Sequence, residues 1–396
     1  MSSLTLGRVK VGMTWRPQLY VRDGRERGVS EDVLQHAVRI ANGLIHATPP
    51  VPPILTLAHL ASLVGVDYGF LRAVVGRRSQ GDYATFQVQK RPDRSARVRE
   101  FRVICVPTEP LLKTQRWIAQ NVLRPQAVHE ASFAYSPGSS ILEAGKIHVG
   151  ARWLIKMDVR RFFESISEIM VFRAFRSIGY QPLIAFELAR LTTRLGKAQR
   201  LRNPRWEGRE DAYTIRSYRE YKLGHLPQGA PTSPMLANLA AGPLDEKVAS
   251  IASEFALRYT RYADDICLSS TDAAFGRRRA SQVIALAYRA MSEVGFSPNI
   301  SKTHVVPPGG RKVVLGLLVD SSEPRLTRET RDTLRQHAHF LTHPNVGPAL
   351  HAARRGFAST IGLRNHVAGL LSFAYSIDPS YAKKIDEKLA TVQWPL

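Results

Sequence analysis

Cysteine is scarce in this sequence, which has only Cys105 and Cys267 among its 396 residues. Two cysteines exclude a disulfide framework, and they exclude a zinc cluster built on cysteines. Each lies among apolar residues that favour strands, so we expect two buried thiols. Buried thiols without such a framework are typical of a reducing compartment, and we therefore predict a cytoplasmic protein.

Long apolar runs are also missing. The most apolar stretch, Val313 to Val319, is long enough only for a buried strand, whereas a membrane-spanning helix needs about 20 apolar residues. No apolar run follows the charges of the first ten residues, MSSLTLGRVK, as it would in a secretory signal. A basic amphipathic anchor is not visible either, so we expect no membrane association.

Acidic residues are few relative to basic ones. The sequence has 33 Asp and Glu against 56 Lys and Arg, a formal net charge of +23. A folded chain this basic repels itself unless it has a polyanionic partner, so nucleic acid is the leading partner class and an anionic membrane surface the alternative. Because 44% of the residues are hydrophobic, the chain is too apolar for disorder, and its length predicts two or three packed subdomains.

The N-terminal part of the sequence contains a clear break. Residues 1–50 are predicted to form an extension with an Arg-rich turn (Arg22, Arg25 and Arg27) and a short helix capped by Ser30. The proline cluster at 49–53 then interrupts the chain, because proline cannot continue a helix. Beyond it, apolar residues alternate from Tyr83 to Val106 around a basic turn, which predicts a β-hairpin.

Further strands are predicted at 153–158, 259–268 and 312–319, with mostly helical segments between them and a helical, basic C-terminal tail. Strands that must pair across such distances indicate an α+β fold rather than a succession of βαβ units.

Two adjacent carboxylates, Asp264 and Asp265, lie between apolar strand residues in the sequence RYADDICL. Such a pair is costly, because both charges lose water and repel each other. A tight turn at Ala263–Asp265 would let both face one site, where a magnesium ion would accept their oxygens. An ordinary surface hairpin with an Asp-Asp turn is the alternative.

A third carboxylate, Asp158, ends the apolar strand at 153–158 and precedes two aromatic residues. Acidic residues brought together from separate strands can clamp two metal ions for phosphoryl transfer, and Asp158 with Asp264 and Asp265 supplies such a set. Asp158 could also act as a helix N-cap. The stiff loop LPQGAPTSP at 226–234 adds Gly229, which permits close backbone approach, and the amide of Gln228; alternatively it is only a turn before a helix.

These three segments, in this order, resemble the reverse transcriptase family, and the retron-type branch near group II intron enzymes more than the retroviral one. The motifs YADD and LPQGAPTSP and the Asp158 strand carry the resemblance. It implies an α+β right-hand polymerase fold with fingers and a palm, an antiparallel sheet packed on helices, over residues 51–320. A helical, RNA-binding thumb would follow over residues 321–396, and residues 1–50 would be an N-terminal extension.

The resemblance implies that Asp158, Asp264 and Asp265 are the catalytic residues. Together with the backbone carbonyl of Val159 they would ligate two Mg²⁺ ions. Phe163, five residues after Asp158, matches the aromatic gate that excludes a ribose 2′-hydroxyl, so dNTPs would be the substrates. Plain core packing is the alternative for this ring.

The resemblance also assigns the remaining nucleotide contacts. Gln228 would lie near the templating base pair, and Lys90, Arg102 and Lys302 would meet the triphosphate. Solvated surface charge is the alternative for these three cations.

RNA contacts are expected in two places. The stretch 194–222 interleaves arginines, Arg205, Arg209 and Arg216 among them, with aromatic rings that could stack on bases. A solvated loop is the alternative. His148 is the one residue kept from an Asn-Ala-x-x-His element that the resemblance links to a retron's own RNA, and it either reads RNA or packs in the interior.

The implied function is that of an RNA-directed DNA polymerase of retron type in the bacterial cytoplasm. It would copy a cognate structured noncoding RNA into single-stranded DNA from a guanosine 2′-hydroxyl, and act in antiphage defence with an effector protein. Two alternatives remain: a defence-associated or diversity-generating reverse transcriptase with different priming, and a non-catalytic, maturase-like RNA-binding protein. The three intact carboxylates argue against the second.

Overall fold

The computed structural model describes residues 15–79, 81–89, 101–196, 205–207, 217–219 and 223–394. These residues form helices and antiparallel sheets, which confirms the predicted α+β class. They belong to two compact units that alternate along the chain. The first unit comprises Met1–Pro137, Val159–Glu246 and Ala290–Pro298, and the second comprises Gly138–Asp158, Lys247–Arg289 and Asn299–Leu396. The contiguous division at residues 50 and 320 stays a prediction.

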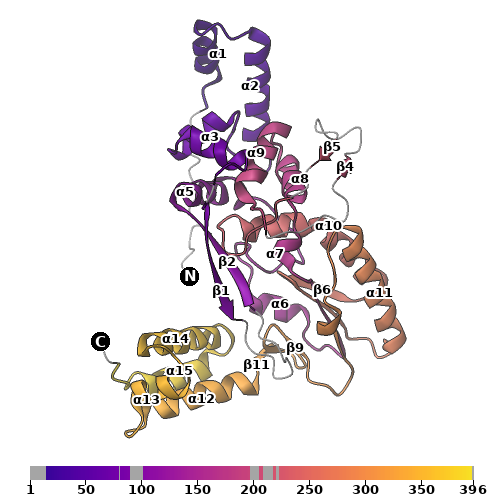
Figure 1. Cartoon of the computed structure of the whole chain (residues 1–396). Coiled ribbons are helices and arrows are strands. Elements are labelled where there is room, and N and C mark those ends of the chain that lie inside the picture. The colour runs from indigo at the N-terminus through magenta and orange to yellow at the C-terminus, as the bar shows by residue number, and fades with distance from the viewer. Residues whose placement is uncertain are drawn as a thin grey trace, which may run out of the picture. The chain divides into compact units, whose positions relative to one another are not determined.

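The first unit starts with two helices, α1 (Pro17–Glu26) and α2 (Glu31–Ile45), drawn in indigo in Figure 1. The predicted Arg-rich turn is confirmed only at Arg27, which lies in the turn after α1, because Arg22 and Arg25 lie within the helix. Proline in the first turn of that helix suits its start, where no amide partner is needed. Ser30 precedes α2 as predicted, although its side chain makes no capping hydrogen bond.

Two short helices follow, each begun by a side-chain cap. Thr56 Oγ1 accepts from the His59 amide at 3.0 Å before α3 (Leu57–Val64), and Asp67 Oδ2 accepts from the Phe70 amide at 2.6 Å before α4 (Tyr68–Val75). They pack with α5 (Glu109–Ile118), which continues as a π-helical turn to Leu123, and with α9 (Pro182–Thr192).

The predicted hairpin is present in the first unit. Strand β1 (Tyr83–Gln89) pairs antiparallel with β2 (Phe101–Pro107), with Gln89 opposite Phe101. Further elements of this unit are α7 (Phe162–Ser165), α8 (Glu168–Ile178), and the short strands β4 (Arg205–Glu207) and β5 (Ser217–Arg219). Helix α10 (Ser233–Glu254) runs from the first unit into the second, as α11 (Arg277–Glu293) runs back.

The second unit contains a four-stranded antiparallel sheet in the order β6-β7-β3-β8. Its strands are β3 (Trp153–Asp158), β6 (Arg258–Tyr262), β7 (Asp265–Ser270) and β8 (His304–Val306). The central strands are almost entirely buried, which explains why they are so apolar in sequence. The single strand predicted at 259–268 is instead two strands joined by the turn at Ala263 and Asp264.

The rest of the second unit consists of small elements around the sheet and a helical C-terminus. Helix α6 (Ile141–Ile147) contacts β6, and the 3₁₀ helix η2 (Ile300–Lys302) contacts β3. The strand predicted at 312–319 is two two-residue strands, β9 (Val313–Val314) and β10 (Leu317–Leu318), because Leu315 and Gly316 turn the chain with φ of 48° and 84°. Strand β11 (Arg325–Leu326) completes that sheet.

The C-terminal tail is helical, as predicted. It forms α12 (Arg328–Thr342), α13 (Gly347–Arg354), α14 (Thr360–Ile377) and α15 (Pro379–Leu389), drawn in yellow in Figure 1. A core that includes Leu334 and Ile385 holds α12, α14 and α15 together. Within the part of the chain that the structure describes, no helix combines the length and apolarity needed to cross a bilayer.

Candidate active site

A hairpin turn in the second unit carries the two adjacent carboxylates. Ala263 adopts the left-handed conformation with φ of 56°, so the chain reverses between β6 and β7 at Asp264. The buried Arg261 guanidinium donates to the Ala263 carbonyl at 3.1 Å and so supports the turn. The turn expected from the sequence is therefore present.

The third carboxylate meets this turn across the sheet. Asp158 is the last residue of β3 and lies directly opposite Asp265 in the β3–β7 register. Side chains directly opposite each other in a sheet are neighbours, and like charges there are destabilising. Desolvation of the Asp265 carboxyl, followed by the charges of Asp264 and Asp158, raises the pKa of Asp265 to about 6. Asp158 thus joins the adjacent pair Asp264 and Asp265 at one end of strands β3 and β7.

Cationic and amide groups partly offset this negative charge. Lys302 Nζ lies 2.9 Å from Asp158 Oδ2, and Asn299 Nδ2 donates to Asp158 Oδ1 at 2.8 Å. Desolvation opposes the charge on Lys302, but its hydrogen bond to Asp158 and the nearby acids raise its pKa. The predicted Lys302 is thus at the carboxylates, whereas Asn299 was not predicted from any sequence pattern.

The donor set suits a hard divalent cation. Carboxylate oxygens are the ligands that magnesium prefers, and clustered carboxylates that repel each other are stabilised by such an ion. Among the described residues, no group of three or more His, Cys, Asp or Glu side chains is arranged so that it could hold a metal ion. Both Asp158 oxygens instead accept hydrogen bonds, from Asn299 Nδ2 and Lys302 Nζ. The three carboxylates therefore have the chemical type that the ion needs and lie near one another on the sheet. Their side chains do not form a complete coordination shell.

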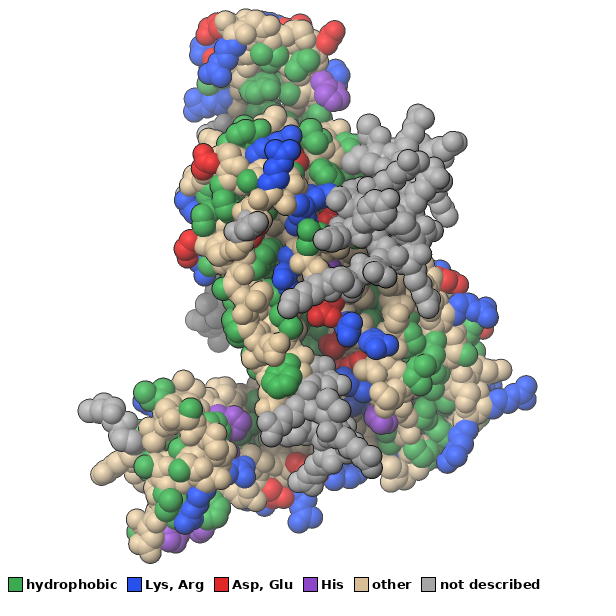
Figure 2. Space-filling model, viewed as in Figure 1, with side chains coloured by type: hydrophobic (Ala, Val, Ile, Leu, Met, Phe, Trp, Pro, Cys, Tyr) green, Lys and Arg blue, Asp and Glu red, His purple; other side chains and the backbone are tan. Residues whose placement is uncertain are grey.

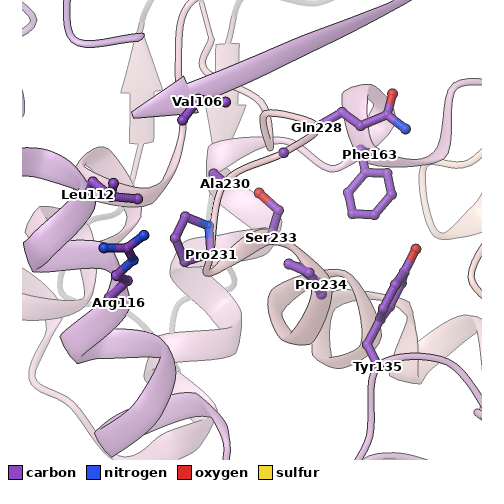
Figure 3. Close-up of a pocket in the computed structure, with 11 residues that line it drawn as sticks. Val106, Leu112, Arg116, Tyr135, Phe163, Gln228, Ala230, Pro231, Ser233 and Pro234 are labelled. Atoms are coloured by element: carbon purple, nitrogen blue, oxygen red, sulfur yellow. The ribbon is translucent and has the colours of Figure 1, made fainter. Parts of the chain in front are cut away.

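A cavity of about 430 Å³ lies in the first unit, lined by residues of the LPQGAPTSP loop and its surroundings. The loop lies alongside β2, because the Cys105 amide donates to the Gln228 carbonyl at 2.7 Å. Figure 3 shows the Gln228 side chain on the same side of the cavity as the rings of Phe163 and Tyr135, with Arg116 of α5 at the opposite end. Gln228 and Phe163, both predicted from the sequence, thus line one cavity.

Gly229 explains why this loop can pass so close to β2. Its φ is +106°, and a Cβ at this position would lie 2.8 Å from Ile104 Cγ2. Both facts favour glycine, because an L side chain is strained there and would also clash.

We expect Gly229→Ala to displace the loop, and with it Gln228, and to destabilise the protein by more than about 1 kcal/mol. The measurement is the urea midpoint together with the KM for dNTP in primer extension. Gly242→Ala is the matched control, because it lies in α10 with open space around its Cα. A Gly229→Ala protein with unchanged midpoint and KM would contradict the close approach.

Of the other predicted residues, two are described with their side chains, and the rest lie wholly or partly outside the described part of the chain. Val159 is buried and bridges to Pro298, and the Arg102 side chain on β2 is exposed. Lys90, Arg209 and Arg216 lie outside the described residues, and of Arg205 only the backbone, in β4, is described.

The assignment of His148 to RNA binding is wrong. The side chain is fully buried in the second unit, where its Nδ1 and Nε2 lie 2.7 Å from Ser269 Oγ and Thr260 Oγ1. Burial, and then the charge of Arg258, lower the pKa of His148 to about 4, so the imidazole is neutral. His148 packs against the sheet and has no surface with which to meet RNA.

Among the described residues, basic side chains are spread over the face drawn in Figure 2 rather than gathered into one patch. The Arg-rich stretch 194–222 was expected to concentrate positive charge, but most of it lies outside the described residues. The structure therefore leaves its proposed contact with RNA untested.

Comparisons with known proteins identify the family of the chain. A model of the family "Reverse transcriptase (RNA-dependent DNA polymerase)" matches residues 88–319, more than half of the chain. The retron Mx65 reverse transcriptase of Myxococcus xanthus is 30% identical over 345 residues, which cover 85% of this chain and 71% of that protein. The retron Ec86 reverse transcriptase of Escherichia coli is 27% identical over 297 residues, covering 73% and 78%. A solved telomerase from Candida albicans matches with a TM-score of 0.38 at 13% identity, over 82% of this chain and 60% of that one.

Proposed function

Because the chain belongs to the retron-type reverse transcriptases, we propose that it copies a structured noncoding RNA of its own into single-stranded DNA with two Mg²⁺ ions. RNA-directed DNA polymerase activity follows from the family itself. The proposal adds the identity of the template class, the metal and the priming group, a guanosine 2′-hydroxyl of the same RNA. An antiphage role with an effector protein is part of it, because the resemblance to retron enzymes implies one.

The observation that carries the chemistry is the proximity of Asp158 to Asp264 and Asp265 at one end of strands β3 and β7. Asp158 and Asp264 would each hold both ions, Asp265 would complete the set, and Val159 would add its carbonyl. When bound, the ions would activate the primer hydroxyl and neutralise charge on the leaving pyrophosphate. An intact set of this kind also argues against a non-catalytic maturase-like role.

The remaining residues would bind and orient the substrates. A cation at Asp158 would compete with the Lys302 ammonium and so leave that ammonium for the triphosphate. Arg102 and Lys90 would meet the same phosphates from the hairpin. Gln228 would contact the templating base pair, and Phe163 would exclude the ribose 2′-hydroxyl. RNA would also be bound by Arg205, Arg209 and Arg216 and by the C-terminal helices.

The test is to purify the protein from cells that carry its native locus and sequence the nucleic acid that copurifies. We expect one abundant RNA joined to DNA by a 2′–5′ branch, and we expect the DNA to be absent when Asp264→Asn replaces the natural chain. Random RNA without a branched product would contradict the retron template. Branch-free DNA copied from many RNAs would point to a reverse transcriptase with different priming.

A further inference from the structure

Two aromatic rings from separate segments meet beside the cavity of the first unit. The centroids of Tyr135 and Phe163 lie 6.2 Å apart with their planes inclined by 55°, a favourable aromatic geometry. Both residues line the cavity, and Figure 3 shows their rings next to each other below Gln228. The family resemblance assigned a role to Phe163 only.

Phe163 is fixed on another side by the core. The Phe162 ring contacts it edge-on with centroids 5.6 Å apart, and Phe162 is itself stacked on Phe296 at 5.7 Å. Phe162 is 3% exposed, whereas Phe163 is only partly buried. The Phe163 ring therefore has a rigid support on the Phe162 side, and its other described ring contact is Tyr135.

Core packing does not explain Tyr135 itself. The side chain is 44% exposed, and its backbone has φ of +63°, a conformation that is strained for a bulky residue. The buried Asn238 on α10 holds the segment around it. Asn238 Nδ2 donates to the Ala134 carbonyl at 2.6 Å and to Ser136 Oγ at 3.4 Å, and Asn238 Oδ1 accepts from Ser132 Oγ at 3.0 Å. Strain kept in place by a buried clamp indicates that the ring's position is needed.

We propose that Tyr135 is a positioning residue for sugar selection, which holds the Phe163 ring so that it cannot turn away from a ribose 2′-hydroxyl. The inference rests on the proposed gate role of Phe163. A steric gate discriminates only as well as its ring is held, because a phenylalanine with space beside it can rotate to another rotamer at small cost. Truncation of Tyr135 would open such space, whereas Tyr135→Phe would keep the ring and lose only the hydroxyl.

Single-nucleotide primer extension tests this, with kcat/KM measured for a dNTP and for the matching rNTP. We expect Phe163→Ala to lower the preference for dNTP the most and Tyr135→Ala to lower it by about tenfold, the size of effect that small changes in pocket shape produce. Tyr135→Phe should restore the preference. Tyr68→Ala is the matched control, since Tyr68 is 48% exposed and lies on α4 in the same unit.

The double variant gives the sharpest result. If Tyr135 acts through Phe163, adding Tyr135→Ala to Phe163→Ala should leave the dNTP-to-rNTP ratio unchanged. Full additivity would overturn the inference, and so would a Tyr135→Ala enzyme that loses activity equally with both nucleotides. A relaxed Phe163→Ala with an unaffected Tyr135→Ala would overturn the positioning role and leave the gate standing. An unchanged ratio in Phe163→Ala would overturn the gate and this inference with it.

Discussion

Primer extension on an RNA template should fall by about a thousandfold or more when Asp264 is replaced by Asn. A single lost transition-state contact typically costs about a hundred- to a thousandfold in kcat, and Asp264 is proposed to hold both ions. The substitution keeps the shape of the side chain and removes its charge. Arg261 holds the turn through the Ala263 carbonyl, so the hairpin should survive the change.

A matched control separates loss of the metal ligand from loss of any surface carboxylate. Asp272 follows β7 in the same unit, is exposed, and caps the next turn by accepting from the Ala274 amide at 2.8 Å. An asparagine oxygen can accept the same hydrogen bond, so Asp272→Asn should extend primers at the natural rate. Chelation of the divalent metal should stop the natural enzyme entirely. Metal-dependent synthesis that survives Asp264→Asn would refute the assignment.

Much of this site could be predicted from the sequence because its chemistry is concentrated in short segments. Asp264 and Asp265 are adjacent, and apolar flanks show that a strand lies on each side of them. The need for a turn followed from the opposite faces of neighbouring strand residues, and the left-handed Ala263 provides it. Gly229 was likewise predicted from local conformational freedom alone.

The residues that sequence reasoning missed act across long separations. Asn299 reaches Asp158 from 141 positions away, and Tyr135 lies beside Phe163 in a segment that Asn238 of α10 contacts from 104 positions away. The sequence left the role of His148 open for the same reason, since its partners Ser269 and Thr260 come from strands more than a hundred positions later. Such contacts depend on sheet register and helix packing, which no local pattern encodes.

Glu168→Gln should destabilise the protein by about 3–5 kcal/mol, the usual cost of removing one partner from a buried ion pair. The Glu168 side chain is 3% exposed, with Oε2 2.7 Å from Arg77 Nη2 and Oε1 2.8 Å from Arg190 Nε. Glutamine keeps the shape but removes the negative charge that faces the partly buried Arg77 and the buried Arg190 guanidiniums. The check is the thermal midpoint, which we expect to fall by roughly 10 °C, together with the urea midpoint.

The same network joins segments that are remote in sequence, so its loss should also weaken the contacts of those segments. Glu168 Oε2 accepts from the Gly224 amide at 3.1 Å, and Arg77 donates to the Thr193 carbonyl at 2.6 Å, so the network fixes both ends of the stretch 194–222. Glu31→Gln, which removes the solvent-exposed pair with Arg25 in the same unit, should change the midpoints far less, because water already screens that charge. Equal midpoints for Glu168→Gln and the natural chain would mean that the two guanidiniums find other counter-charges, and that the ends of 194–222 are held by backbone contacts such as the Arg194–His225 bridge instead.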